Sequence, residues 1–144
     1  MPGGLALDLR VDQREKEGIQ ILDLRGPLKA GDSEAKLRAT INALVKASAF
    51  KVILNLAEVT RIDAAGLEAL VSCYTQIQKY GGALKLARLN TERLSLKVLT
   101  KLNTVFQVFV DEQDAVNSFF PGRAVRQYDV LEWVRAQQEG GGRS

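Results

Sequence analysis

The stretch VTRIDAAGLEAL, residues 59–70, joins a strand directly to a helix. After Asp63 the apolar residues Leu67, Leu70 and Val71 follow helical spacing. The Asp63 carboxylate can accept hydrogen bonds from the N–H groups of the first helical turn, which otherwise lack partners. Such junctions often carry a phosphate-binding or reactive group, yet two alanines follow Asp63 here. The stretch therefore predicts an α/β fold and raises the question of what this helix start does.

Hydrophobic patterning upstream of the junction predicts a β-hairpin followed by a buried strand. Leucine and valine alternate with other residues over 5–11, which predicts a half-buried strand. A polar turn at 12–18 leads to a second strand at 19–24, which Gly26-Pro27 ends. Residues 51–56, KVILNL, are almost continuously apolar, as expected for a central strand covered on both faces.

One helix is predicted before that central strand in the sequence, and another after it. Gly31-Asp32-Ser33 supplies N-cap chemistry for the first helix. Its apolar stripe consists of Leu37, Ile41, Leu44 and Val45. The second helix begins after Asp63, and Gly81-Gly82 ends it.

The remaining sequence predicts two further strand–helix units. Strands are expected at 83–89 and 105–110. Asn90 or Thr91 should cap the helix between them, which carries Leu94, Val98 and Leu102. Residues 111–119 form the last predicted core helix. The order β-β-α-β-α-β-α-β-α predicts a mixed sheet of about five strands packed with four helices, plus a short C-terminal helix.

Pro121-Gly122 marks the predicted boundary of the domain. We expect residues 1–120 to form one domain and residues 121–144 to form a C-terminal extension. The extension should contain a short helix over 126–137 and a disordered tail. An isolated helix of this length is marginal, so it should pack on the domain or on a second copy. The side chains expected to make that contact are Leu131, Trp133 and Val134.

Composition excludes several classes of protein. The chain of 144 residues has no histidine and one cysteine, so a zinc site of the usual kind, a Ser-His-Asp triad and an intrachain disulfide are excluded. Cys73 is expected to be a packing residue, since no histidine can activate it. Basic and acidic residues alternate at a net charge of +3, which disfavours nucleic-acid binding. Without a signal sequence or an apolar run long enough to span a membrane, we expect a cytoplasmic protein.

The residues from 51 to 86, KVILNLAEVTRIDAAGLEALVSCYTQIQKYGGALKL, resemble the STAS domain of bacterial anti-sigma factor antagonists. That family shares a strand, an Asp-Ser-Ser-Gly junction, a helix and a Gly-Gly turn into another strand. ILDLRGPLKAGDSEAKLRATI matches its earlier strand, Gly-x-Leu turn and helix, and KLNTVFQVFVDEQDAVNSF matches its ending. The resemblance covers roughly residues 5–120 and implies a STAS-type mixed sheet.

The resemblance implies a binding module that is not an enzyme and needs no metal or cofactor. Such domains bind a kinase-like anti-sigma factor, which inactivates them by phosphorylating the second serine of the junction. Asp63 matches the family's aspartate, Ala64 the first serine, Ala65 the phosphorylated serine and Gly66 the glycine. Ala64 and Ala65 depart from the family pattern because they lack the serine hydroxyl groups. Lys29 is a second departure, since many members of the family have an acidic residue at that position. The expected partner-binding residues are Thr60, Arg61, Asp63, Ala64, Ala65, Gly66 and Glu68.

The sequence therefore favours an anti-sigma factor antagonist-like module without its phosphoacceptor, acting unswitched or as a scaffold. Its expected partner is a kinase-like anti-sigma factor or a related signalling protein, with a homodimer possible and neither nucleic acid nor membrane involved. From the residues alone, Asp63 could be a helix cap without any binding role. The alternative function is a nucleotide or small-ligand sensor that uses the same helix start, because free N–H groups and the helix dipole attract anions there.

Overall fold

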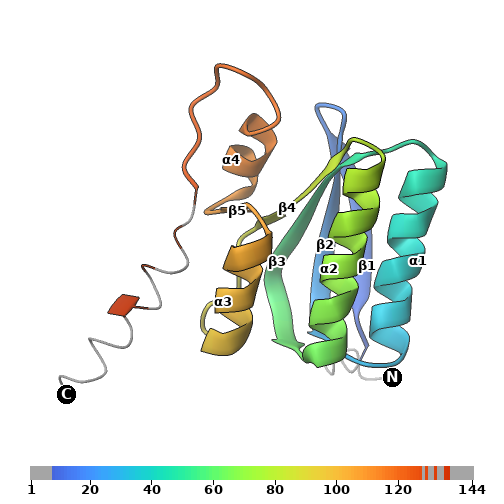
Figure 1. Ribbon diagram of the computed structural model, residues 1–144, viewed down its shortest axis with the longest axis vertical. Helices are drawn as coiled ribbons and strands as arrows, with labels where there is room; N and C mark the ends of the chain where they lie inside the picture. Colours follow the sequence, from blue (N-terminus) through green and yellow to red (C-terminus); the bar gives the residue numbers. More distant parts are fainter. Residues whose placement is uncertain (1–7, 128, 130–131, 133–134, 137–144) are drawn as a thin grey trace.

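The computed structural model describes residues 8–127, 129, 132, 135 and 136. Five strands and four helices alternate along this part of the chain (Figure 1). They are β1 (Arg10–Lys16), β2 (Ile19–Leu28), α1 (Asp32–Lys46), β3 (Lys51–Ile62), α2 (Ala64–Lys79), β4 (Ala83–Ala87), α3 (Leu96–Val105), β5 (Val108–Phe109) and α4 (Glu112–Asn117). The predicted mixed sheet of five strands packed with four helices is confirmed.

The strands form one sheet in the order β1-β2-β3-β4-β5. β1 and β2 are antiparallel, and each later neighbour pairs in parallel, as a hairpin followed by β-α units requires. α1 and α2 lie side by side across one face of the sheet, and α3 follows them over the same core (Figure 1). None of the helices in the described residues is long and apolar enough to cross a membrane.

Side chains of the central strands β2 and β3 point alternately to the two faces of the sheet and fill a separate core on each. Leu22 and Leu54 point into the larger core under α1, α2 and α3. Their neighbours Ile21 and Ile53 point to the opposite face, where Val116 of α4 covers them. Because successive side chains of a strand face opposite ways, a continuously apolar strand needs cover on both faces. α4 supplies that cover on the second face.

The N-terminal strand differs from the prediction. β1 comprises Arg10–Lys16, so most of the predicted polar turn is strand and only Glu17 and Gly18 turn the chain, both with positive φ. β1 is an edge strand whose side chains mostly face solvent, so its polar residues carry no alternating signal. Residues 5–7 of the predicted strand lie outside the described residues, and Leu9 is buried just before β1.

β2 also continues past its predicted end at Gly26-Pro27, as far as Leu28. Its pairing with β1 ends at Arg25, so beyond that point β2 has one neighbouring strand. Two irregularities in the β2–β3 register accommodate the change. Proline lacks an N–H group but is tolerated where a strand is paired on one side only. β3 likewise extends beyond its predicted end and reaches Ile62, at the junction.

Two helix caps differ from those predicted. Gly31 is the N-cap of α1 and makes no side-chain bond, while Ser33 instead binds the backbone of Lys29. Ser95 caps α3 by accepting a hydrogen bond from the Val98 N–H group at 3.2 Å. The predicted caps Asn90 and Thr91 belong to the preceding loop, so their N-cap chemistry stabilises a turn instead.

The last two elements are shorter than predicted. β5 is only Val108–Phe109, and α4 is Glu112–Asn117 with Asp111 as its N-cap. The Asp111 carboxylate accepts a hydrogen bond from the Asp114 N–H group at 2.8 Å. Half of the positions of the helix predicted over 126–137, among them all of its expected contact side chains Leu131, Trp133 and Val134, lie outside the described residues.

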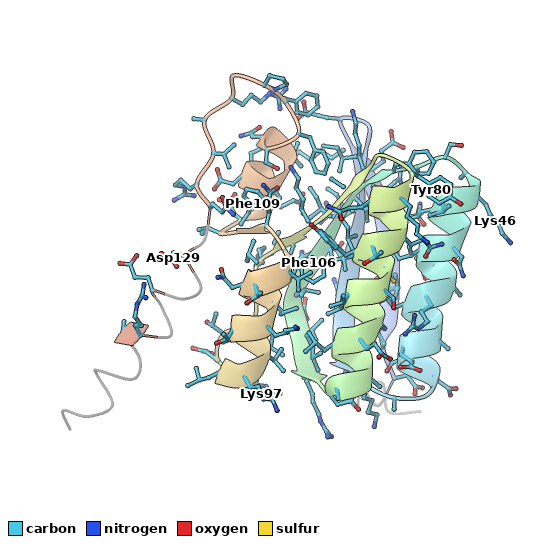
Figure 2. All side chains as sticks on the ribbon, viewed as in Figure 1. Lys46, Tyr80, Lys97, Phe106, Phe109 and Asp129 are labelled. Atoms are coloured by element: carbon cyan, nitrogen blue, oxygen red, sulfur yellow. The ribbon has the colours of Figure 1, made fainter. Side chains whose placement is uncertain are left out.

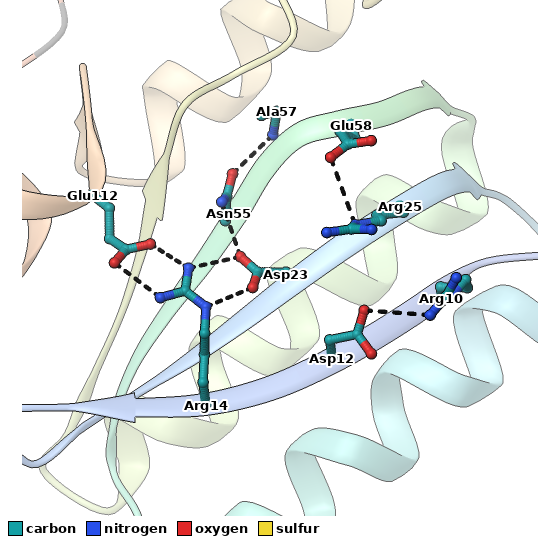
Figure 3. A network of polar contacts seen from close by, with 9 residues as sticks. All are labelled: Arg10, Asp12, Arg14, Asp23, Arg25, Asn55, Ala57, Glu58 and Glu112. Carbon is teal, nitrogen blue, oxygen red and sulfur yellow. Dashed lines mark hydrogen bonds and ion pairs between the residues drawn. The ribbon is translucent and has the colours of Figure 1, made fainter.

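Arg14 joins three parts of the chain through its guanidinium group (Figure 3). Its Nε donates to the Asp23 carboxylate of β2 at 2.6 Å, and its Nη1 donates to Glu112 of α4 at 3.0 Å. Asn55 of β3 donates a further hydrogen bond to Asp23 at 2.9 Å. The bonds from Arg14 and Asn55 hold the pKa of Asp23 below its ordinary value. This network fastens α4 to the hairpin at the edge of the second core.

The first turn of α2 packs unusually close to the end of β2. A Cβ atom on Gly66 would lie 2.8 Å from the carbonyl carbon of Leu28 and 3.0 Å from its Cγ. Real Cβ atoms do not approach backbone this closely, so only glycine fits without displacing one of the two elements. Gly66 therefore sets the distance between the helix and the sheet at the junction.

We predict that Gly66→Ala lowers the free energy of unfolding by about 1–3 kcal/mol, because the added methyl group forces the helix away from Leu28. Chemical denaturation monitored by circular dichroism measures this change. Helix propensity alone would give the opposite sign, since alanine is favoured over glycine by about 1 kcal/mol. In the control Ala64→Gly, at an exposed position of the same turn, only that propensity should be lost. A stabilised Gly66→Ala variant would contradict the close approach.

A second prediction concerns Arg14→Met, which should cost about 1 kcal/mol at neutral pH because Arg14 is partly exposed. The folded pKa of Asp23 is lowered, so its stabilisation is present above the unfolded pKa of about 3.9 and is lost as pH falls through the folded pKa. The variant and the wild type should therefore converge in acid. Thermal denaturation from neutral to acidic pH measures the difference.

Arg10→Met is the matched control for that experiment. Arg10 also faces a carboxylate on the hairpin, but its contact with Asp12 is 3.9 Å long between two largely exposed side chains. Its loss should leave the stability nearly unchanged at every pH. If both substitutions changed the stability equally, the hydrogen bonds from Arg14 to Asp23 and Glu112 would contribute no more to stability than an ordinary surface charge.

Candidate functional site

Asp63 ties the start of α2 to the loop after β2. Its Oδ1 accepts a hydrogen bond from the Gly66 N–H group at 2.8 Å, which is the expected helix cap. Its Oδ2 accepts a second bond from the Ala30 N–H group at 3.1 Å. The backbone N–H of Asp63 donates to the Leu28 carbonyl at 3.2 Å. One aspartate thus fixes both the helix start and the β2–α1 loop.

Hydrogen bonding holds Asp63 in its ionised form. The N–H groups of Gly66 and Ala30 lower the pKa of the Asp63 carboxyl group below its ordinary value, and nearby Arg61 lowers it further. Each bond favours the carboxylate because only the charged form accepts both N–H groups well. At neutral pH the carboxylate is therefore ionised and accepts hydrogen bonds from two backbone N–H groups. A group held this way suits a structural role better than proton transfer.

The expected site residues differ in exposure. Arg61, Ala64 and Glu68 are exposed, while Thr60, Asp63 and Ala65 are half-buried. Gly66 is buried on the side of α2 that faces Leu28. Gly66 therefore positions the site from below, and the other residues form its surface.

The β2–α1 loop completes this surface, and its contact with Asp63 was not predicted from the sequence. Lys29 and Ala30 are exposed beside the first turn of α2. Ser33 shapes the loop by accepting from the Lys29 N–H group and donating to the Lys29 carbonyl, each at 2.8 Å. Parallel pairing of β2 with β3 brings these residues together across 33 positions of sequence. Only the strand order, which local patterning does not specify, could have revealed that contact.

The site lies at one end of the molecule. The side chain of Lys97, at the start of α3, marks that end, and Tyr80 with Lys46 marks the opposite end (Figure 2). Asn90, in the β4–α3 loop, donates a hydrogen bond to the carbonyl of Val59 at 3.2 Å. The last residues of β3 are thereby held from a second side. The end of β3 and the start of α2 are thus hydrogen-bonded to two loops, β2–α1 and β4–α3.

The part of the chain that the structure describes supports neither of two kinds of reactive site, a cysteine nucleophile or a metal centre. Cys73 is buried in the main core, and burial raises the pKa of its thiol to about 11, so the thiolate is scarce at neutral pH. This agrees with the packing role expected from the sequence. Among the described residues, histidine, cysteine, aspartate and glutamate form no group of three or more able to hold a metal ion.

Comparison with solved structures shows the same fold in several proteins. A proposed anti-sigma factor antagonist from Thermotoga maritima superposes with a TM-score of 0.67 at 19% identity, covering 75% of this chain and 92% of that one. The anti-sigma factor antagonist SpoIIAA in its unphosphorylated form gives 0.61 at 13% identity, covering 80% and 99%. An anti-sigma factor antagonist from Mycobacterium paratuberculosis gives 0.62 at 18% identity, covering 79% and 96%. At these identities the likeness establishes the fold.

The family assignment rests on a sequence match. A model of the STAS domain family matches residues 10–115, which run from the first residue of β1 into α4. That span contains all five strands, the α2 junction and the β2–α1 loop. The chain belongs to the STAS domain family.

Proposed function

We propose that this chain is a protein-binding module of bacterial signalling, which acts as an anti-sigma factor antagonist that phosphorylation cannot switch off. Its binding surface is the start of α2 together with the β2–α1 loop. The observation that carries the proposal is the pair Ala64 and Ala65 in the first turn of α2, where Asp63 binds the helix start to the β2–α1 loop. The proposed partner is a kinase-like anti-sigma factor or a related signalling protein.

The position of Ala65 explains why a hydroxyl group there would matter. A phosphorylated serine would add nearly two negative charges at this surface. The helix itself tolerates an anion at its start, because the dipole and the free N–H groups favour it. A partner docked on the same surface would face a new, poorly solvated charge and would dissociate. SpoIIAA, a structural neighbour, is known in both an unphosphorylated and a phosphorylated form. With alanine at this position, the surface keeps one charge state.

The charges around the two alanines indicate which partner surfaces fit. Arg61 and Lys29 are exposed cations on either side of the junction, and Glu68 is an exposed anion one turn into α2. Complementary charges steer association and exclude wrong partners more than they add affinity. We propose that the partner presents acidic side chains toward Lys29 and Arg61 and a basic one toward Glu68. The apolar patch of Ala64 and Ala65 between them allows close backbone approach.

We predict that Ala65→Glu abolishes capture of the partner, whereas Gln78→Glu does not. Both substitutions add one negative charge to α2, but Gln78 lies in the last turn, at the opposite end of the molecule. Full-length tagged protein is incubated with bacterial cytoplasm, and bound proteins with a kinase-like ATP-binding domain are quantified by mass spectrometry. Loss should reach about tenfold or more, which corresponds to about 1.4 kcal/mol. Equal capture by both variants would place the interface elsewhere.

We also predict that no phosphate appears at residues 63–66 of the wild type when the captured partner and ATP are added. Ala65→Ser should restore an acceptor, because its backbone geometry is already set by Asp63 and Gly66. Phosphopeptide mass spectrometry distinguishes the two proteins. Phosphate on Ser33, Ser72 or Thr60 of the wild type would show that the switch has moved, and the unswitched function would be wrong. An unmodified Ala65→Ser variant, with a partner shown to be an active kinase, would contradict the positional match.

A further inference from the structure

The chain after α4 is fixed to the domain by two arginines. Arg126 donates to the Asp114 carboxylate at 3.2 Å and to the Asp111 carboxylate at 3.1 Å, both at the start of α4. Arg123 donates to Glu17 in the β1–β2 turn at 2.9 Å. In Figure 1 this part of the chain loops back from α4 and returns to β5. We call residues 121–127 the strap.

The strap ends on the edge of the sheet. Gln127 forms an antiparallel bridge with Phe109 of β5, so the strap adds one residue pair beyond the last strand. Two residues later the Asp129 carboxylate accepts a hydrogen bond from the Glu132 N–H group at 2.9 Å. An aspartate followed three residues later by glutamate is a helix-start pattern, and this bond is its expected capping interaction. The strap therefore delivers the start of a helix to the sheet edge.

The segment that follows is strongly amphipathic in sequence. Asp129, Glu132 and Arg135 are exposed and fall at i, i+3 and i+6, on the polar side of a helix. The other side of such a helix would carry the apolar residues Val130, Leu131, Trp133 and Val134. A tryptophan alone offers roughly 150–250 Å² for burial, and a short helix gains its stability from such packing. This apolar side needs a surface to cover it.

The domain has an apolar hollow beside the point where the strap ends. It measures about 240 Å³ and is lined by Arg88, Leu89, Thr91, Phe109 and Val110. Val110 is 44% exposed, although its neighbour Phe109 is buried. Phe109 both lines the hollow and bridges to Gln127, so the hollow adjoins the start of the amphipathic segment. Arg88 places a cation at the rim, toward which the acidic polar side of the segment can turn.

We propose that residues 128–136 dock as a helix on this chain's own domain, with Trp133 covering the hollow between the ends of β4 and β5. Trp133 follows the cap residue Asp129 by four positions, a helical rise of about 6 Å, and Asp129 follows Gln127 by two, so no long linker separates Trp133 from the sheet edge. Closing so short a loop costs little entropy, and the effective concentration of a tethered segment is high. Both facts favour the chain's own domain over a second copy. This inference is independent of the proposed partner.

Trp133 is the only tryptophan of the chain, so its fluorescence reports on this contact alone. In the full-length protein we expect emission shifted to shorter wavelength than that of free tryptophan and acrylamide quenching reduced several-fold. Val110→Asp should remove both effects, because it puts a charge into the hollow at a partly exposed position that the core does not require. The control Leu96→Asp changes an equally exposed residue, 40% against 44%, outside the hollow, and should leave both effects unchanged.

Three results would overturn the proposal: emission of the wild type like that of free tryptophan, no change in Val110→Asp, or protection that disappears on dilution together with a dimer in sedimentation. The last result would identify a second copy as the occupant. Asp129→Ala gives a test that does not touch the domain. It removes the helix cap and should raise acrylamide quenching toward that of free tryptophan, and full protection in this variant would show that the contact does not depend on the helix.

Discussion

The close contact between the first turn of α2 and the end of β2 is the constraint on which the site depends. Gly66 lets the helix rest on the backbone of Leu28, and Asp63 spans the same gap by binding Gly66 and Ala30. Steric fit and hydrogen bonding thus both fix the distance between the start of α2 and the end of β2. That distance places the first turn of α2, including the two alanines that carry the proposed function. A change of either Gly66 or Asp63 would alter the shape of the junction, independently of which protein binds there.

The second face of the sheet shows how a small domain completes its core with few residues. α4 is short, but it covers the isoleucines of β2 and β3 that the larger helices cannot reach. A helix of this length is unstable alone, so its position depends on anchors. Arg14 binds Glu112 at the start of α4, and Arg126 of the strap binds Asp111 and Asp114 there. The strap is therefore one of the two anchors that hold the start of α4.

Sequence patterning predicted the order of the elements, the mixed sheet and the α2 cap, because these depend on periodicity and on local capping chemistry. It was wrong at β1, where an edge strand carries polar residues on its exposed side chains, and at Pro27, where β2 has lost one neighbour. It also placed the α3 cap too early, since Asn90 looks like a cap but supports the end of β3. The Asp63–Ala30 bond was missed because it depends on strand order. Local signals are therefore reliable inside elements and weak where two distant segments meet.

The chemistry of Asp63 separates structure from signalling at this junction. Its carboxylate accepts hydrogen bonds from two backbone N–H groups, which lower its pKa, so it has a structural role whichever side chains follow it. An intact Asp-x-x-Gly pattern therefore indicates the shape of the surface. The two residues between the aspartate and the glycine bear on how that surface is regulated. Both hydrogen bonds of Asp63 come from backbone donors, so the identity of the side chains at positions 64 and 65 does not alter them. Under the proposed function, the surface keeps its geometry while alanine at both positions removes the hydroxyl groups that phosphorylation would need.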